Sequence, residues 1–247
     1  MNENSRAFVA GRRVLGRSLG WLVVWLAGGV LALWLKSSFA VVAVAVAGGW
    51  ILFSAFILYF FRDPTPRVPT APEAVVAPAH GLVDCVEETS EPEFLGSACR
   101  RISICLSVFD VHVQNAPVAG KITFLKYQPG QFLSALKTES ARCNENTLMG
   151  IESRERPGER VAVRQIAGLI ARRIVTWVNV GDAVARGQRL GLIQFGSRCD
   201  LYLPLSAQVT VSPGDRVVGG ETVVAKRASS EDRLDQTPAT AQSSLQV

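Results

Sequence analysis

The residues best suited to covalent chemistry are Gly196 and Ser197, which lie between two apolar runs rather than in a polar turn. Those runs, 190–195 and 199–203, are predicted to be buried strands. A serine hydroxyl becomes a nucleophile when a nearby base takes its proton, and a glycine before it leaves its own carbonyl open to attack. Although most Gly-Ser pairs in hairpins are only turns, this setting between apolar strands should hold the Ser197 hydroxyl and the Gly196 carbonyl in a fixed environment.

Histidine is the first candidate for the base, and the chain has two. His112 lies in Phe109-Asp-Val-His-Val113, facing opposite to its apolar neighbours and just before a predicted turn. His80 lies in Val76-Ala-Pro-Ala-His-Gly81, between two short predicted strands. A single histidine is more often a hydrogen-bonded structural residue than a catalyst, but its pKa near neutrality suits proton transfer. We therefore expect His112 to be the better candidate.

One pattern, Gly-Asp-x-Val-x-x-Gly, is written twice around these residues, beginning at Gly181 and at Gly214. Each copy predicts a Gly-Asp turn and a second glycine at which a short strand doubles back. Two such units facing each other predict a small sandwich, with Gly196-Ser197 at the hairpin that joins them. Residues 70–227 also show little helical periodicity. The fold class is predicted to be mainly β, a β-sandwich of the barrel-sandwich-hybrid kind.

Two apolar runs precede this body. Residues 1–18 are polar and basic, residues 19–35 and 39–61 are apolar, and Lys36 lies between the runs. Their lengths predict a transmembrane helical hairpin, because a removed signal peptide would not be followed at once by a second run. The arginines before the first run, with Arg62 and Arg67 after the second, outweigh Lys36, which places both ends in the cytoplasm. Gly28-Gly29 and Gly48-Gly49 would let the helices approach closely.

The chain is thus predicted to divide into a basic cytoplasmic N-terminus (1–18), a two-helix anchor (19–61), a Pro-rich linker (62–74), a catalytic domain (75–227) and a disordered tail (228–247). A net charge of +5 without an aromatic-basic stripe argues against nucleic-acid binding. Five scattered cysteines without metal spacing fit a reduced cytosolic compartment, and no metal is expected.

Three consecutive segments resemble the phosphatidylserine decarboxylase family, in its short, membrane-anchored branch. They are Ile166-Ala-Gly-Leu-Ile-Ala-Arg-Arg-Ile174, the first Gly-Asp repeat, and the following Gly-Gln-Arg-Leu-Gly-Leu-Ile-x-Phe-Gly-Ser-Arg198. The resemblance runs from about Phe60 to Lys226. It implies a carboxy-lyase made as a proenzyme, which splits at Gly196-Ser197 into chains 1–196 and 197–247 that stay together. It also implies that Ser197 becomes a pyruvoyl group, which forms a Schiff base with phosphatidylserine and accepts electrons as carbon dioxide leaves, in place of pyridoxal phosphate.

The same resemblance implies roles for particular residues. His112, in Val111-His-Val-Gln-Asn-Ala-Pro-Val-Ala-Gly120, matches the family's proton-transfer histidine. Arg172 and Arg173 match its Ala-Arg-Arg, and with Arg198 they are candidates to bind the substrate's phosphate or carboxylate. The expected partner is a phospholipid in a bacterial-type inner membrane, with the catalytic domain on the cytoplasmic side. The resemblance leaves room for a homo-oligomer.

The departure from the family lies at His80, where an aspartate normally orients the catalytic histidine. A neutral histidine supplies no negative charge, and Asp84 and Asp110 are both near enough in sequence to replace it. The alternative is an uncleaved, inactive adaptor that keeps the anchored β-sandwich. A biotinyl- or lipoyl-type carrier has a similar Gly-Asp repeat, but it needs a lysine at the hairpin tip, where this chain has Gly-Ser-Arg.

Overall fold

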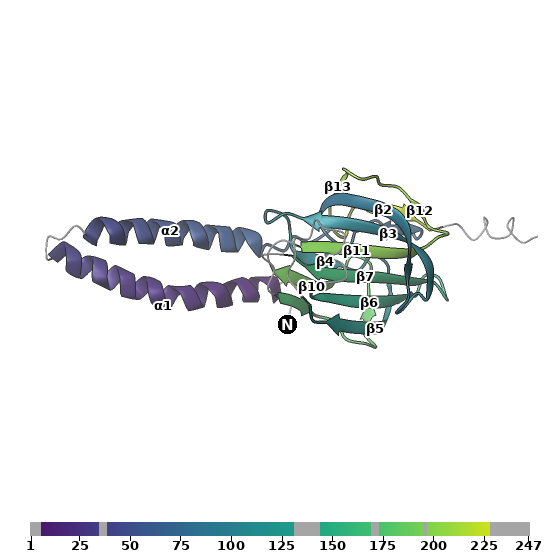
Figure 1. The fold of residues 1–247 in the computed structure, drawn as a ribbon, viewed down its shortest axis with the longest axis horizontal. Coiled ribbons are helices and arrows are strands. Elements are labelled where there is room, and N and C mark those ends of the chain that lie inside the picture. Colours follow the sequence, from purple (N-terminus) through teal and green to yellow (C-terminus); the bar gives the residue numbers. More distant parts are fainter. Residues whose placement is uncertain (1–5, 35–38, 131–143, 169–172, 195–196, 228–247) are drawn as a thin grey trace, which may run out of the picture.

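The computed structural model describes residues 6–34, 39–130, 144–168, 173–194 and 197–227. Two long helices extend from one end of a β-body (Figure 1). The predicted tail, 228–247, lies outside the described residues. The elements in chain order are α1 (Arg6–Trp34), α2 (Phe39–Phe60), β1 (Ala74–Val76), β2 (Gly81–Glu91), β3 (Ser97–Leu106), β4 (Val113–Asn115), β5 (Gly120–Gln128), β6 (Asn146–Ser153), β7 (Arg160–Ala167), β8 (Arg173–Thr176), β9 (Ala183–Val184), β10 (Arg189–Gln194), β11 (Ser197–Pro204), β12 (Gln208–Val209), β13 (Arg216–Val217) and β14 (Val223–Lys226).

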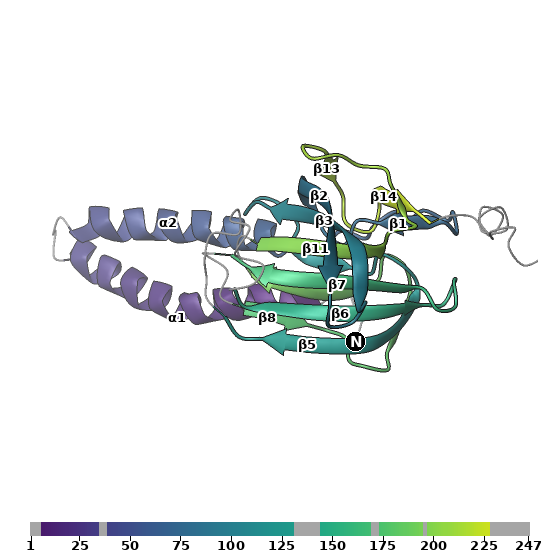
Figure 2. The same ribbon diagram turned by 45° about the vertical axis from the view of Figure 1, so that its right-hand side comes forward.

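The two helices lie side by side in both views (Figures 1 and 2), and each is long and apolar enough to cross a membrane. They approach closely at Gly29, where an added Cβ would lie 2.3 Å from the Cβ of Ala43. The other three glycines of the two pairs have open space beside them, so close approach is confirmed only at Gly29. Trp50 Nε1 donates a hydrogen bond to Ser18 Oγ over 3.1 Å, which fixes the register of the pair.

The body consists of three antiparallel sheets. The largest has the strand order β13-β2-β3-β11-β7-β6-β5-β9 and curls around the smaller sheets β4-β10-β8 and β1-β14-β12 (Figure 2). Apolar side chains that alternate along the central strands, such as Ile102 and Ile104 of β3 and Leu201 and Leu203 of β11, fill the interior. Because side chains alternate between the faces of a strand, this pattern buries one face of the sheet. The prediction of a mainly β fold preceded by a pair of apolar helices is confirmed.

The two Gly-Asp repeats close opposite edges of the eight-stranded sheet. One supplies β9, which pairs with β5, and the other supplies β13, which pairs with β2. In each, the aspartate carboxylate accepts a main-chain hydrogen bond over 2.8 Å, Asp182 from Asn179 and Asp215 from Ser212. The glycines before the aspartates have φ of +101° and +97°, which residues with a side chain rarely adopt. The repeat is thus one turn used twice.

The Gly196-Ser197 bond does not lie in a hairpin, so that prediction was wrong. β10 pairs with β4 and β8, whereas β11 pairs with β3 and β7. The described strands β10 and β11 thus belong to different sheets and do not form a hairpin with each other, and Gly196 itself is outside the described residues. Two apolar strands separated by Gly-Ser have the local pattern of a hairpin, and consecutive strands usually are neighbours. Here the partners come from distant parts of the sequence.

The predicted linker, 62–74, is fastened to the body by arginines. Arg189 Nε lies 2.7 Å from both carboxylate oxygens of Asp63, and the two side chains are only 8% and 6% exposed. Arg186 donates to the main-chain oxygen of Pro69 over 3.1 Å. These contacts fix the end of α2 relative to β10. The division of the chain into five segments stays a prediction.

Substituting Asp63→Ala should lower the free energy of unfolding by about 3 kcal/mol, because it leaves the Arg189 charge buried without a partner. Asp63→Ala combined with Arg189→Ala should cost less than the sum of the single changes. The measurement is urea unfolding of the detergent-solubilised protein. As a control, Glu152→Ala removes a half-exposed ion pair with Arg160 and should cost at most about 1 kcal/mol. An equal loss of unfolding free energy in Asp63→Ala and in Glu152→Ala would contradict the role assigned to Asp63.

Candidate active site

Ser197 is the first residue of β11 and lies in the middle of the eight-stranded sheet, opposite Leu106 of β3 and Ala167 of β7. Its side chain is 2% exposed, and Oγ has no hydrogen-bond partner among the described residues. Leaving a buried polar group unpaired costs roughly 1–3 kcal/mol, so such groups need an explanation. A hydroxyl that must react, rather than hold a hydrogen bond, is such an explanation.

His112 is fully buried at the same corner of the body. It follows the turn after β3, whose last residue, Leu106, pairs with Ser197. The main-chain oxygen of His112 also accepts a hydrogen bond over 3.2 Å from Ile193, near the end of β10. The strands on both sides of the Gly196-Ser197 bond therefore approach the His112 segment, and the structure brings the predicted serine and the predicted histidine to one corner.

The hydrogen bonds of His112 define its protonation. Nδ1 lies 2.9 Å from the main-chain oxygen of Asp110. A carbonyl can only accept, so Nδ1 carries the proton and Nε2 presents its lone pair. Nε2 is buried and has no partner among the described residues. Burial lowers the pKa of His112 to about 4, against the opposing effect of the hydrogen bond and charge of Asp110. At neutral pH the ring is an unprotonated base.

The ring of His112 is covered by the last residue of α2. The centroids of Phe60 and His112 are 4.1 Å apart, with 33° between the ring planes. Phe60 belongs to a buried apolar cluster that joins both helices to β4 and β10, and that includes Val113 and Leu192. The end of the helix pair is therefore one wall of the site. This contact was not predicted, because Phe60 ends an apolar run whose residues were all assigned to the membrane.

His80 lies beside this corner, half-buried. Burial lowers its pKa, and the charge of Asp110 raises it. Gly81 brings the chain close to β3: it has φ of +149°, and an added Cβ would lie 2.2 Å from the oxygen of Cys105. The positive charge of a protonated His80 would lower the pKa of His112, so the two histidines are within electrostatic reach.

Of the two candidate acids, Asp110 and not Asp84 lies near the histidines. Asp110 is buried, and its charge raises the pKa of both rings. Its carboxylate accepts hydrogen bonds from the Ser107 N–H, over 2.8 Å, and from Arg216. Asp84 is exposed, and its charge acts on Cys105 instead. Asp110 thus orients His112 through its main-chain oxygen while its carboxylate supplies the negative charge.

Two buried glutamines hold the main chain of His112. Gln114 Nε2 donates to the His112 oxygen over 2.8 Å, and Gln165 Nε2 donates to Gln114 Oε1 over 2.6 Å. These residues link β4 to β7. Together with Arg216, they were missed from the sequence, because a polar residue in a strand carries no local sign that it will be buried beside a histidine.

The predicted substrate arginines have different surroundings. Arg198 is nearly buried; its Nε and Nη2 donate to Asp200 over 2.6 and 3.1 Å, and Nη2 donates to Ser103 Oγ over 2.9 Å. Arg173 is exposed at the start of β8, opposite Gln194. Arg172 lies outside the described residues. Binding of substrate by these arginines stays a prediction. Within the part of the chain that is described, no cluster of three or more histidine, cysteine or acidic side chains could hold a metal.

Comparison with known proteins shows similarity along most of the chain, not only around Ser197 and His112. The family described as phosphatidylserine decarboxylase matches residues 53–225. Three similar curated proteins are each named phosphatidylserine decarboxylase proenzyme. That of Symbiobacterium thermophilum is 45% identical over 216 residues, 87% of this chain and 96% of its own. Those of Desulfotalea psychrophila and Saccharopolyspora erythraea are 46% and 45% identical over 71% and 74% of this chain, and over 81% and 77% of their own lengths. The chain therefore belongs to the phosphatidylserine decarboxylase family of carboxy-lyases.

Proposed function

We propose that the protein is a membrane-bound proenzyme that splits itself between Gly196 and Ser197 and then converts phosphatidylserine to phosphatidylethanolamine and carbon dioxide. The observation that carries this proposal is a pair of buried polar atoms, Ser197 Oγ and His112 Nε2, that lie at one corner of the body and have no hydrogen-bond partner among the described residues. One is a nucleophile that needs to lose a proton, and the other is a base free to take it. No observation favours the uncleaved adaptor.

In the self-cleavage step, His112 Nε2 takes the proton of Ser197 Oγ, which attacks the carbonyl carbon of Gly196. The C–N bond breaks, the nitrogen of residue 197 takes a proton, and Gly196 becomes an ester on the serine oxygen. Loss of the Ser197 Cα proton then breaks the Cβ–Oγ bond and releases Gly196 as a carboxylate. Residue 197 is left as dehydroalanine, and water converts it to a ketone with loss of ammonia.

Asp110 supports the charge that this step creates. The imidazolium formed at His112 keeps its Nδ1 hydrogen bond to the Asp110 oxygen, and the Asp110 carboxylate stabilises the cation. This support offsets part of the cost of a buried charge, and it does so without an aspartate at position 80. His80 contributes no negative charge.

In the decarboxylation, the pyruvoyl group at position 197 would supply a ketone that takes up the substrate's amine and draws off the electron pair left as carbon dioxide departs. The position fits that group, because Oγ makes no hydrogen bond to a described residue that the conversion would break. β3 and β7 hold residue 197 from both sides. His112 is placed to return a proton to the substrate's Cα, and Phe60 keeps water from its ring.

The two apolar helices serve as a membrane anchor in this proposal. Most of their large apolar side chains are exposed, which suits lipid rather than water. Tethering holds the body at the surface to which a phospholipid substrate is confined. The arginines in the first turns of α1 and just after α2 favour a cytoplasmic body on a bacterial inner membrane.

Denaturing electrophoresis of the purified protein should show two fragments, one ending at Gly196 and one beginning at residue 197 with no free amine by mass spectrometry. Ser197→Ala should give one intact chain, because the nucleophile is gone. Ser206→Ala, at an exposed serine, should split normally. A single band from the unaltered protein after prolonged incubation would leave the adaptor as the better description.

The pH dependence of self-cleavage should follow the low pKa of His112. Because the pKa falls from 6.5 to about 4, the base stays unprotonated, and the rate should hold down to about pH 5. Phe60→Ala should move the midpoint upward, since it exposes the ring to water. Phe53→Ala, on an exposed part of the same helix, should not. A midpoint near 6.5 in all three proteins would refute the assignment.

The same pKa difference affects stability. Between pH 6.5 and about 4 the unfolded chain binds the proton and the folded chain does not, so stability falls as the pH is lowered. Each rate is therefore measured only where near-ultraviolet circular dichroism shows the folded state.

His80→Asp should speed self-cleavage by about tenfold or more, because a negative charge beside His112 would stabilise its cation. His80→Asn has a similar shape without the charge and should leave the rate within about threefold of the unaltered protein. The measurement is the time course of splitting after synthesis. Equal rates in the two variants would show that charge at position 80 plays no part.

A further inference from the structure

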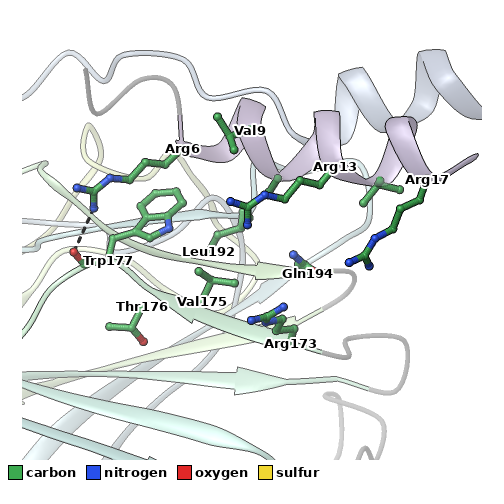
Figure 3. Close-up of a pocket in the computed structure, with 12 residues that line it drawn as sticks. Arg6, Val9, Arg13, Arg17, Arg173, Val175, Thr176, Trp177, Leu192 and Gln194 are labelled. Atoms are coloured by element: carbon green, nitrogen blue, oxygen red, sulfur yellow. Dashed lines mark hydrogen bonds between the residues drawn. The ribbon is translucent and has the colours of Figure 1, made fainter. Parts of the chain in front are cut away.

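A pocket of about 530 Å³ lies between the first turns of α1 and the sheet β4-β10-β8. Four arginines line it, and we call it the arginine pocket: Arg6, Arg13, Arg17 and Arg173. In Figure 3, Arg17 extends from α1 toward Gln194, Arg13 extends from α1 toward Leu192, and Arg173 lies below on the neighbouring strand. Apolar side chains, among them Trp177, form the rest of its wall.

Within the described residues, no acidic side chain neutralises the charge of the arginine pocket, and none lines it. Within the described part of the chain, neither Arg13 nor Arg17 nor Arg173 has a carboxylate within 4.0 Å. Arg6 donates to the main-chain oxygen of Trp177 over 3.2 Å (Figure 3). Like charges four residues apart on a helix destabilise it, so an anion bound between helix and sheet would relieve the repulsion between Arg13 and Arg17.

The position of the pocket along the membrane normal indicates which anion it could bind. α2 has 22 residues and is roughly 33 Å long, which matches the hydrocarbon core of a bilayer. A Cβ added at Gly11 of α1 would lie 3.1 Å from the Cβ of Phe61, which directly follows the end of α2. Arg13 therefore lies close to the end of the apolar helix pair, whereas Arg17, next to the Ser18–Trp50 hydrogen bond, lies deeper along it. Arginine side chains at such a level extend toward the phosphate layer of the membrane. The pocket therefore opens where lipid headgroups lie.

The pocket is also close to the reacting bond. Gln194 lines it and precedes Ser197 by three residues, a stretch of chain that spans at most about 11 Å. Leu192 lies in its wall and in the cluster that contains Phe60, whose ring covers His112. In phosphatidylserine only a two-carbon spacer separates the phosphate from the amine. A lipid with its phosphate in the pocket would have its amine on the side of Ser197.

We propose that the arginine pocket binds the phosphodiester of the phosphatidylserine substrate, so that α1 takes part in substrate recognition as well as anchoring. This inference rests on the proposed function and extends it to three residues of the anchor helix. Arginine suits the role, because its planar guanidinium donates two parallel hydrogen bonds to a phosphate.

Binding is tested first, in full-length Ser197→Ala protein, so that the result does not depend on self-cleavage or turnover. Dihexanoylphosphatidylserine is titrated calorimetrically into protein in an uncharged detergent. Arg13→Ala with Arg17→Ala should weaken binding by about tenfold or more, because charge-assisted hydrogen bonds are lost. The matched control is Arg12→Ala, an exposed arginine on the same helix that does not line the pocket. No change in the double variant, or an equal loss in the control, would overturn the proposal.

Turnover then distinguishes the substrate from another anionic lipid. In protein with Ser197 intact, the double variant should raise KM for dihexanoylphosphatidylserine by about tenfold and change kcat little, since binding rather than chemistry is affected. Dihexanoylphosphatidylglycerol should compete with the substrate in the unaltered protein and much less in the double variant. If the double variant loses phosphatidylglycerol binding while KM stays the same, the pocket serves a different lipid and the proposal fails. If the unaltered protein has no decarboxylase activity, the proposed function fails, and the titration still decides the pocket.

Discussion

The pairing of β11 on both sides is the constraint on which the site depends. Its residues from Ser197 onward are held by β3 on one side and by β7 on the other. Because a strand in mid-sheet has little freedom, the reactive side chain is fixed by the sheet rather than by a loop. The other groups are placed against it: β3 leads into the turn before His112, and Gln165 of β7 reaches toward the same segment through Gln114.

In the proposed mechanism, the role that the family resemblance gives to one aspartate is divided between the main chain and the side chain of Asp110. The main-chain oxygen of Asp110 sets the tautomer of His112, and its carboxylate supplies charge at a distance while it is held by Ser107 and Arg216. A main-chain acceptor orients the ring without needing a particular residue type. This explains how the geometry around His112 can persist although position 80, where the family normally has an aspartate, is a histidine.

Local chemistry made much of the fold predictable. The Gly-Asp turns follow from glycine's freedom and from aspartate's ability to bind the main chain nearby, and alternating side chains marked the strands. Pairing was not predictable in the same way, so the bond at Ser197 was wrongly placed in a hairpin. Asp110 was named as a candidate, but only the fold separates it from Asp84. The arginines of α1 were explained by membrane orientation alone, because the pocket that they line together with Arg173 and Gln194 forms only in the tertiary structure.

Splitting the chain before β11 would turn a continuous sheet into a subunit boundary. The fragment that starts at Ser197 carries β11, β13 and β14, which pair with β3 and β7, with β2 and with β1 of the other fragment. Before the break these strands find one another within a single polymer. Afterwards their reunion is a bimolecular encounter that no longer benefits from the connecting chain. The mature protein would thus be assembled only once, and its lifetime would be set by how slowly β11 leaves the sheet.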